Sequence, residues 1–221
     1  MSHFSNHSED NYLKVIYKLK EQNIRKLNNV SIAKALELSP ATVLEMIRKL
    51  VKKNLLVLKD DKSIQLTEQG KKKALLTIRR HRLWEVFLVN KLNYKWNEVH
   101  ELAEELEHID AAGITERLET FLGNPLFDPH GDPIPDKNGK VKKSNAIPLP
   151  SAALLKYHIV ANFAETNDDF LQYLSQLEIK PGVRIRIEKL LPYDSSLVVR
   201  SGKKQFQLSQ KVAENILVQP S

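Results

Sequence analysis

Apolar residues recur every three or four positions through the first half of the chain, whereas apolar and polar residues alternate in short runs near its end. The helical spacing predicts a first helix on Tyr12, Leu13, Ile16 and Leu19, and a short second helix on Ile32, Ala35 and Leu36. The alternation predicts short strands after residue 150. The pattern therefore favours a mainly α protein that ends in a small β domain.

A third helix is predicted to begin at Ser39-Pro40, because a serine hydroxyl can cap a helix and a proline ring suits its first position. Its apolar residues are Val43, Met46, Ile47 and Leu50, and its other face is polar. The strand-like runs 55–58 and 64–66 then predict a β-hairpin wing. Two short helices followed by a wing form a winged helix-turn-helix, which binds DNA. A protein-interaction module of the same shape is the alternative.

The next segment predicts three more helices. The first is long and runs from Thr67 to about Asn90; the second is capped by Asn97; the third is capped by Asp110 and ends at Gly123. The third carries more apolar residues than one small domain needs, namely Ile114, Leu118, Phe121 and Leu122. A helical dimer interface is therefore predicted here.

The helix after Asn97 carries imidazoles and carboxylates on one face, at His100, Glu104, Glu107 and His108. His81 and Glu85 repeat the pattern four residues apart on the preceding helix. Nitrogen and oxygen donors at this density suit manganese, ferrous iron or zinc. A merely solvated acidic face is the alternative. A zinc protease is disfavoured, because Glu104 stands where that motif needs its second histidine.

Residues 124–150 are rich in Pro, Gly, Asp and Lys, a composition typical of a connector. Beyond it, alternation at Tyr157, Ile159, Ala161 and Phe163 predicts a strand. Residues 168–177 predict a short helix, and 183–187, 197–200, 205–208 and 216–218 predict further strands. The expected organisation is a winged-helix domain at 1–75, a helical metal-binding and dimerisation domain at 76–123, a linker at 124–150 and a small SH3-like β-barrel at 151–221.

Charge separates along the chain. Residues 1–75 hold 15 Lys and Arg against 8 Asp and Glu, whereas residues 76–123 hold 6 against 9, and the whole chain is +7. A polyanion-binding surface is therefore predicted at the N-terminus, directly before a cation-binding segment. The absence of cysteine excludes disulfides, thiolate ligands and cysteine nucleophiles. No membrane-spanning run or signal peptide is visible, which favours a cytoplasmic protein without a membrane partner.

These features, in this order, resemble the diphtheria toxin repressor family of metal-dependent transcriptional repressors, including its manganese transport regulator branch. The resemblance covers nearly the whole chain. It is carried by Asn11-Tyr12-Leu13, Ser39 to Val43, His81 to Glu85, Val99-His100 with Glu107-His108, and the run from His130 to Pro135. It implies a DNA-binding repressor that is not an enzyme, with a C-terminal SH3-like domain.

The resemblance also implies two ligand sets. The primary site would use Asn11, Glu104, Glu107 and His108, and a neighbouring site His81, Glu85 and His100, completed by Asp169 or Glu165. Glu104 stands where the iron-responsive branch has Cys, which favours Mn(II), with Fe(II) as a second candidate and Zn(II) able to bind in vitro. Asn11 replaces the Met or Asp of the two branches, and Lys14 replaces a ligating Glu of the manganese branch. The two-metal cluster of that branch is therefore not expected.

The functional prediction is a homodimer that binds a palindromic operator in double-stranded DNA when it is loaded with metal, and so controls metal uptake genes. The residues expected to face base edges are Ser39, Ala41, Thr42, Leu44 and Glu45, and those expected to contact phosphate are Arg48, Lys49, Lys59 and Lys62. A winged-helix regulator that answers to a small molecule, and a metal-dependent hydrolase, are the alternatives.

Overall fold

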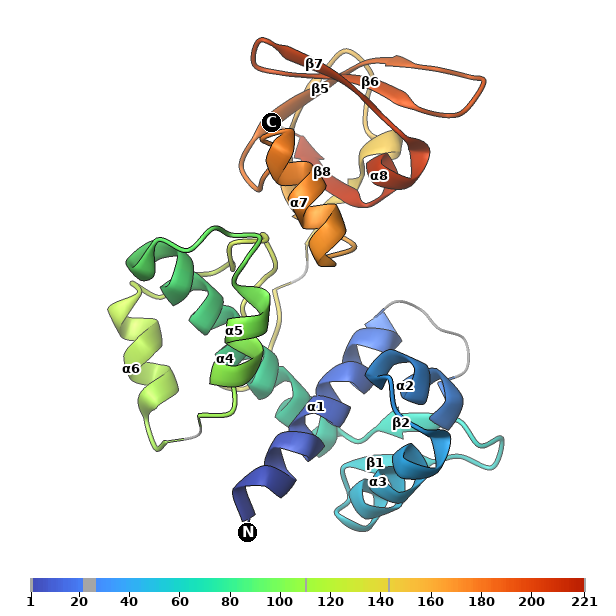
Figure 1. Cartoon of the computed structure of the whole chain (residues 1–221), viewed down its shortest axis with the longest axis vertical. Helices are drawn as coiled ribbons and strands as arrows, with labels where there is room; N and C mark the ends of the chain where they lie inside the picture. The colour runs from blue at the N-terminus through green and yellow to red at the C-terminus, as the bar shows by residue number, and fades with distance from the viewer. Residues whose placement is uncertain (1, 22–26, 110, 143, 221) are drawn as a thin grey trace. The chain divides into compact units, whose positions relative to one another are not determined.

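The computed structural model describes residues 2–21, 27–109, 111–142 and 144–220 of the chain (Figure 1). The helices are α1 (Ser2–Glu21), α2 (Asn29–Leu36), α3 (Pro40–Lys52), α4 (Glu68–Leu92), α5 (His100–Leu106), α6 (Ile114–Phe121), α7 (Asp168–Gln176) and α8 (Gln210–Glu214), with a short 3-10 turn at Leu149–Ser151. The strands are β1 (Leu56–Leu58), β2 (Ile64–Leu66), β3 (Ile147–Pro148), β4 (Tyr157–Phe163), β5 (Arg184–Leu190), β6 (Leu197–Ser201), β7 (Lys204–Leu208) and β8 (Ile216–Pro220). Among the helices in these ranges, none is both long enough and apolar enough to cross a membrane.

The chain forms two compact units, which are described separately. The first comprises Met1–His81, Leu106–Ala111 and Pro135–Val141, and the second comprises Arg82–Glu105, Ala112–Ile134 and Lys142–Ser221. Helix α4 therefore contributes residues to both units.

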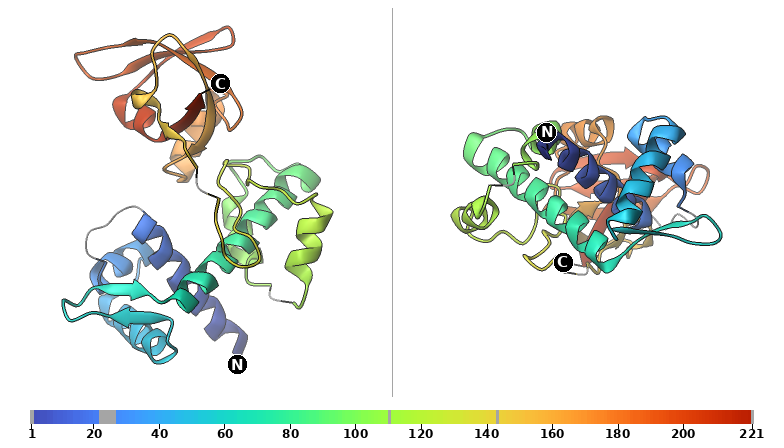
Figure 2. Two further views of the ribbon diagram at one scale, coloured as in Figure 1. Left: turned by 180° about the vertical axis from the view of Figure 1, so that it is seen from behind. Right: turned by 90° about the horizontal axis from the view of Figure 1, so that it is seen from below.

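The first unit contains the three helices and the hairpin that the apolar pattern predicts. Ser39 Oγ accepts a hydrogen bond from the backbone N–H of Thr42, and Pro40 is the first residue of α3. Strands β1 and β2 pair antiparallel, and the hairpin extends away from the helices of this unit in both views of Figure 2. The core joins residues of α1, α2, α3 and the hairpin, with Leu13, Ile32, Val43, Ile47 and Leu50 among the most deeply buried.

The C-terminal part of the second unit is a β domain. Its antiparallel sheet has the strand order β3-β8-β4-β5-β6-β7 among the described residues. Helix α7 packs Phe170, Leu171 and Leu174 against this sheet. The strands predicted at 183–187, 197–200, 205–208 and 216–218 are confirmed, whereas β3 and α8 were not predicted.

Strand β4 is confirmed, but its alternating apolar residues do not make up its buried face. His158 and Val160 are buried while Tyr157 and Ile159 are exposed, so the strand presents its other face to the core. Its pairing with β8 shifts register between Val160 and Asn162, which brings Phe163 to the buried side. The alternation of apolar and polar residues was enough to predict the strand. Which of its two faces is buried depends on its pairing with the neighbouring strands.

The helix limits near the predicted ligands also differ from expectation. Helix α5 begins at His100 rather than after Asn97, whose side-chain oxygen has no hydrogen-bond partner among the described residues. It ends at Leu106, so Glu107 and His108 follow it in a turn instead of continuing the helical stripe. Helix α6 begins after Gly113 and is followed by Gly123 at φ +77°, as predicted. The predicted cap at residue 110 lies outside the described residues.

Candidate functional site

A buried cluster of metal-type donors lies in the second unit. Glu85 comes from α4, and Asp128 and His130 come from the loop after α6; each offers one ligand atom, and these atoms lie within 4.8 Å of one another. All three residues are at most 7% exposed. We refer to Glu85, Asp128 and His130 as the Glu85 centre. The sequence had assigned only Glu85 of the three to a site.

Asp128 is held at both carboxylate oxygens, by the backbone of its own loop at Oδ1 and by Arg82 of α4 at Oδ2. Its Oδ1 accepts the backbone N–H groups of His130 at 2.8 Å and Asp132 at 2.9 Å, which tightens the turn. The Arg82 guanidinium lies 3.2 Å from Oδ2 of Asp128 and 3.0 Å from Oδ2 of Asp132. The carboxylate is thus oriented before any cation arrives, a condition for a preorganised site.

The same loop is anchored to strand β4 of the β domain. Asn162 donates a hydrogen bond to Oδ1 of Asp132 at 2.9 Å. Gly131 has φ +84°, and a Cβ there would lie 1.8 Å from the backbone oxygen of Ala161, so only glycine fits. The Trp96 ring contacts both His130 and Phe163, with centroid distances of 5.7 and 6.0 Å. The β domain therefore positions one wall of the Glu85 centre.

The electrostatics of this centre favour an added cation. Burial, together with the neighbouring Asp132 and Glu85 carboxylates, raises the pKa of Asp128 to about 7. Burial would lower the pKa of His130, but the hydrogen bond and charge of Glu85 outweigh it and the pKa is raised. The Nε2 atom of His130 is buried without a hydrogen-bond partner among the described residues. Two carboxylates and an imidazole with a free ring nitrogen suit Mn(II), Fe(II) or Zn(II).

Two further predicted ligands lie beside Glu85 in the same unit. His100 Nδ1 is 3.4 Å from Glu85 Oε1, and His100 Nε2 is 3.4 Å from Glu104 Oε1. His100 and Glu104 are about one-third exposed, whereas Glu85 is buried. The structure thus places His100 next to Glu85, together with loop residues that were not among the predicted ligands.

A different arrangement surrounds Glu107 in the first unit. The Lys14 ammonium lies 2.6 Å from Oε1 of Glu107, and Nδ1 of His81 lies 2.7 Å from Oε2. His108 Nε2 is 3.8 Å from Oε1. We refer to Lys14, His81, Glu107 and His108 as the Glu107 centre. Because a lysine is present among residues expected to hold a metal, this set fits a cation from solution poorly.

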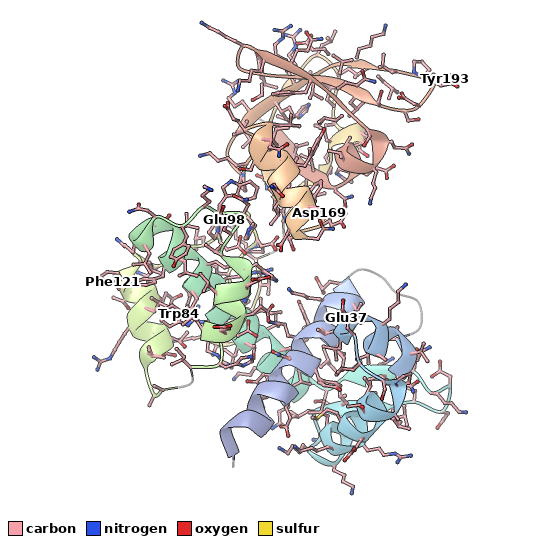
Figure 3. All side chains as sticks on the ribbon, in the orientation of Figure 1. Glu37, Trp84, Glu98, Phe121, Asp169 and Tyr193 are labelled. Carbon is pink, nitrogen blue, oxygen red and sulfur yellow. The ribbon has the colours of Figure 1, made fainter. Side chains whose placement is uncertain are left out.

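The remaining predicted ligands lie elsewhere. Asn11 precedes Lys14 by three residues on α1, and its buried Oδ1 has no hydrogen-bond partner among the described residues. Asp169 is exposed on the first turn of α7, where Figure 3 labels it. The Glu165 carboxylate accepts a hydrogen bond from the Asn167 side chain. The assignment of these three residues as ligands stays a prediction.

Helix α1 carries two more buried acids. Glu9 is paired with Lys49 at 2.9 Å and with Lys53 at 2.8 Å, at the end of α3. Burial would raise the pKa of Glu9, but the hydrogen bonds of Lys53 and Lys49 outweigh it and the pKa is lowered. Asp10 is paired with Lys73 and Arg80 of α4. The Glu9 pairs connect α1 to α3, the helix that was predicted to read DNA, and the Asp10 pairs connect α1 to α4.

The predicted DNA-contacting residues are mostly exposed. Among them Ser39, Ala41, Thr42, Glu45, Arg48, Lys59 and Lys62 are exposed, whereas Leu44 and Lys49 are partly buried. Ser39 and Thr42 are hydrogen-bonded to each other through their hydroxyls at 2.8 Å. Lys49 is paired with Glu9, so the charge of Lys49 is compensated within the protein.

Sequence reasoning missed Asp128 and His130 because residues 124–150 had the composition of a connector. A local signal was present in Asp128-Pro129-His130-Gly131-Asp132, where two acids and an imidazole alternate beside an obligatory glycine. Such a run can form a tight turn that gathers its polar side chains. It could have been read as a ligand loop.

Three family models match successive parts of the chain. The model of the N-terminal DNA-binding domain of iron-dependent repressors matches residues 3–64, that of their metal-binding and dimerisation domain matches residues 67–136, and the FeoA domain matches residues 148–220.

Curated relatives and solved structures match along nearly the whole length. The iron-dependent repressor IdeR of Mycobacterium leprae is 26% identical, and the diphtheria toxin repressor of Corynebacterium diphtheriae is 29% identical; each alignment covers 94% of this chain and 95% of the relative. A structure described as a manganese-dependent transcriptional repressor in complex with manganese has a TM-score of 0.85 and 33% identity, covering 96% of this chain and all of that one. The structure of ScaR with bound Cd²⁺ has a TM-score of 0.82 and 33% identity, covering 96% and 99%.

Proposed function

Because the chain belongs to the iron-dependent repressor family, and is therefore a metal-dependent transcriptional repressor and not an enzyme, we propose that the Glu85 centre holds its activating cation. The main support is that Glu85, Asp128 and His130 are buried and that one ligand atom from each lies within 4.8 Å of the others. His100, 3.4 Å from Glu85, is a fourth donor at the edge of the set. A bound cation would supply the positive charge that lets both carboxylates stay ionised at this depth.

We propose Mn(II) as the metal, with Fe(II) second. Carboxylate and imidazole donors without thiolate suit Mn(II), although raw affinity for such a site follows the order that places Zn(II) above it. The relatives support both choices, since their names include manganese-dependent and iron-dependent repressors. Zn(II) is expected to bind in vitro and to be limited by its availability in the cell.

The contacts of this chain suggest how metal bound at the Glu85 centre could be coupled to the DNA-binding helix α3. Asp128 and His130 belong to a loop that is anchored on β4, and Glu85 belongs to α4, so a cation held by all three fixes the loop against the helix. Within the first unit, Asp10 ties α1 to α4 and Glu9 ties α1 to the end of α3. The orientation of α4 is thereby linked to α3. Such coupling is typically worth about 1 to 3 kcal/mol.

On DNA, we propose that α3 enters the major groove and that the β1–β2 hairpin contacts the backbone. The exposed positions Ser39, Ala41, Thr42 and Glu45 face outward from the packed side of α3 and are available to base edges. Arg48, Lys59 and Lys62 are exposed cations suited to phosphate. Lys49 is a weaker candidate because it is paired with Glu9.

The helical segment 76–123 is proposed to form the homodimer. Helix α6 has no buried residue within this chain, and Phe121 is 63% exposed although it contacts Phe87. A second copy would cover this face and space the two α3 helices for a palindromic operator, with half-sites about 34 Å apart. Phe121→Glu is expected to shift the protein from dimer to monomer in sedimentation.

The proposed function is tested by fluorescence anisotropy on operator DNA, with and without Mn(II), for the full-length protein and for Glu85→Gln. The wild type is expected to bind at least tenfold more tightly with Mn(II), which is the about 1.4 kcal/mol that such coupling readily supplies. Glu85→Gln is expected to lose this response. Glu98→Gln, an exposed glutamate of the same unit, serves as the matched control and should respond as the wild type does. Equal binding by all three proteins in both conditions would contradict the proposal.

A further inference from the structure

The Glu107 centre contains a buried lysine, which is rare in proteins unless the ammonium is paired. The Lys14 side chain is 5% exposed and the Glu107 side chain is fully buried. Their charged atoms are 2.6 Å apart, the length of a strong charge-assisted hydrogen bond. This pair joins the middle of α1 to the turn that follows α5 within the first unit.

The ammonium lies against Glu107, a residue of the predicted primary site, and His108 of the same site approaches the same carboxylate. Its nitrogen and His108 Nε2 both approach Oε1 of Glu107, at 2.6 and 3.8 Å, and His81 takes the other oxygen. Asn11 lies on the same face of α1 as Lys14, one turn earlier. Both oxygens of the only carboxylate in the Glu107 centre are therefore engaged by groups of this chain.

The neighbouring charges also oppose a divalent cation. Asp10, the residue before Asn11, is already paired with Lys73 and Arg80, and Arg80 also donates a hydrogen bond to the backbone oxygen of Glu107 at 2.7 Å. A metal ion entering here would meet the Lys14 ammonium at close range and the Arg80 guanidinium next to it. The charge of this region is balanced from within the protein.

We infer that the Lys14 ammonium is a built-in cation that takes the place of a metal ion in the Glu107 centre. This centre then takes no metal from solution, and the link between α1 and Glu107 persists in the presence of a chelator. The chain accordingly binds one regulatory cation instead of two. This last statement rests on the proposed function, because it assumes that the Glu85 centre is the one that binds metal.

The inference predicts a gain of binding when the lysine is removed. In Lys14→Met the side chain keeps a similar volume but loses its charge, so Glu107, His108 and Asn11 can receive a metal. In Lys14→Arg the positive charge stays, so this variant is the matched control. Glu85→Gln isolates the Glu107 centre, since it removes a ligand of the other one.

The experiment measures protein-bound manganese per chain by mass spectrometry after equilibrium dialysis of the full-length proteins against excess Mn(II). The wild type and Lys14→Arg are expected to retain one ion, Lys14→Met two, Glu85→Gln none, and the double variant Lys14→Met/Glu85→Gln one. Two ions in the wild type, or one in Lys14→Met, would overturn the inference and leave the proposed function standing. Retention of one ion by Glu85→Gln and two by Lys14→Met would contradict the proposed site and leave the inference standing.

A second readout covers the case in which Lys14→Met is poorly folded without metal. Melting temperatures are measured for Glu85→Gln and for the double variant, in chelator and in Mn(II). In chelator, the double variant is expected to melt at a lower temperature than Glu85→Gln. Its melting temperature should rise when Mn(II) is added, because a metal that binds the folded state stabilises it. Glu85→Gln is expected to melt at the same temperature in both conditions. A double variant that does not respond to Mn(II) would count against the inference.

Discussion

The Glu85 centre and the Glu107 centre both place a buried glutamate beside imidazole nitrogens, yet they differ in where the positive charge comes from. At the Glu107 centre, Lys14 of the same chain lies 2.6 Å from the carboxylate. At the Glu85 centre, Arg82 lies against Asp128 and Asp132, and burial together with the neighbouring Asp132 and Glu85 carboxylates raises the pKa of Asp128 to about 7.

This difference separates a structural ion pair from a binding site. A buried carboxylate is stable only when a positive charge or several hydrogen bonds compensate it. Lys14 supplies a positive charge from within the chain, so the Glu107 carboxylate does not need a cation from solution. The Glu85 centre has three carboxylates in or next to it and one guanidinium. Under the proposed function, an exchangeable cation from solution completes the balance of charge there. We therefore expect only the second arrangement to report metal concentration.

The largest expected effect comes from breaking the internal pair. Glu107→Gln removes the carboxylate that lies 2.6 Å from the buried Lys14 ammonium, and the free energy of unfolding should fall by about 3 to 5 kcal/mol. Urea denaturation of the metal-free protein measures it. The double variant Lys14→Met/Glu107→Gln should recover most of the loss, because neither charge remains. A loss below about 1 kcal/mol in Glu107→Gln would mean that the pair is not compensating a buried charge.

The next effect concerns the centre that is expected to exchange its cation. Asp128→Asn removes a ligating carboxylate, so Mn(II) affinity should fall by at least about 100-fold, more than is typical when only a group that orients a ligand is lost. Calorimetric titration measures this. Asp168→Asn, at an exposed position of the same unit, is the control and should bind as the wild type. Unchanged affinity in Asp128→Asn would remove Asp128 from the site.

Metal binding at the Glu85 centre should depend on pH. Asp128 must lose its proton to bind metal, so Mn(II) affinity should be about tenfold lower at pH 6 than at pH 8, and lower still because the pKa of His130 is also raised. In the metal-free protein the sign for stability is opposite. A raised carboxyl pKa contributes stability that is complete below the unfolded value of 3.8 and is lost as the pH rises through about 7. Titrations and melting curves at both pH values test this, and an affinity independent of pH would contradict it.

The smallest expected effect tests the support of the ligand loop by the β domain. Gly131→Ala places a Cβ 1.8 Å from the backbone oxygen of Ala161, so the loop must shift and carry His130 with it. We expect Mn(II) affinity to fall by about tenfold, since displacing a supporting group costs 10- to 100-fold. Gly202→Ala, also at a positive φ but with open space around its Cβ, controls for backbone strain alone. Equal effects of the two substitutions would show that the contact with β4 is unimportant.

Local signals in the sequence were sufficient for most of the elements. Ser39 and Pro40 marked the start of α3, Thr67 accepts the hydrogen bond of Gly70 that caps α4, and Gly123 follows the end of α6 at a positive φ. These features depend on residues within a few positions of one another. The cap predicted at Asn97 failed, since α5 begins at His100, and α5 ends at Leu106, before Glu107.

The sequence by itself determined the order of the elements, the basic N-terminal part, the oxygen and nitrogen character of the donors, and the presence of a lysine where a carboxylate was expected. Only the tertiary structure decided which donors meet: Glu85 with Asp128 and His130, more than 40 residues away, and Lys14 with Glu107, which are 93 residues apart. The physical reason is that a buried charge is compensated by whatever the fold brings within a few ångströms. That proximity depends on long-range packing, and no spacing along the chain encodes it.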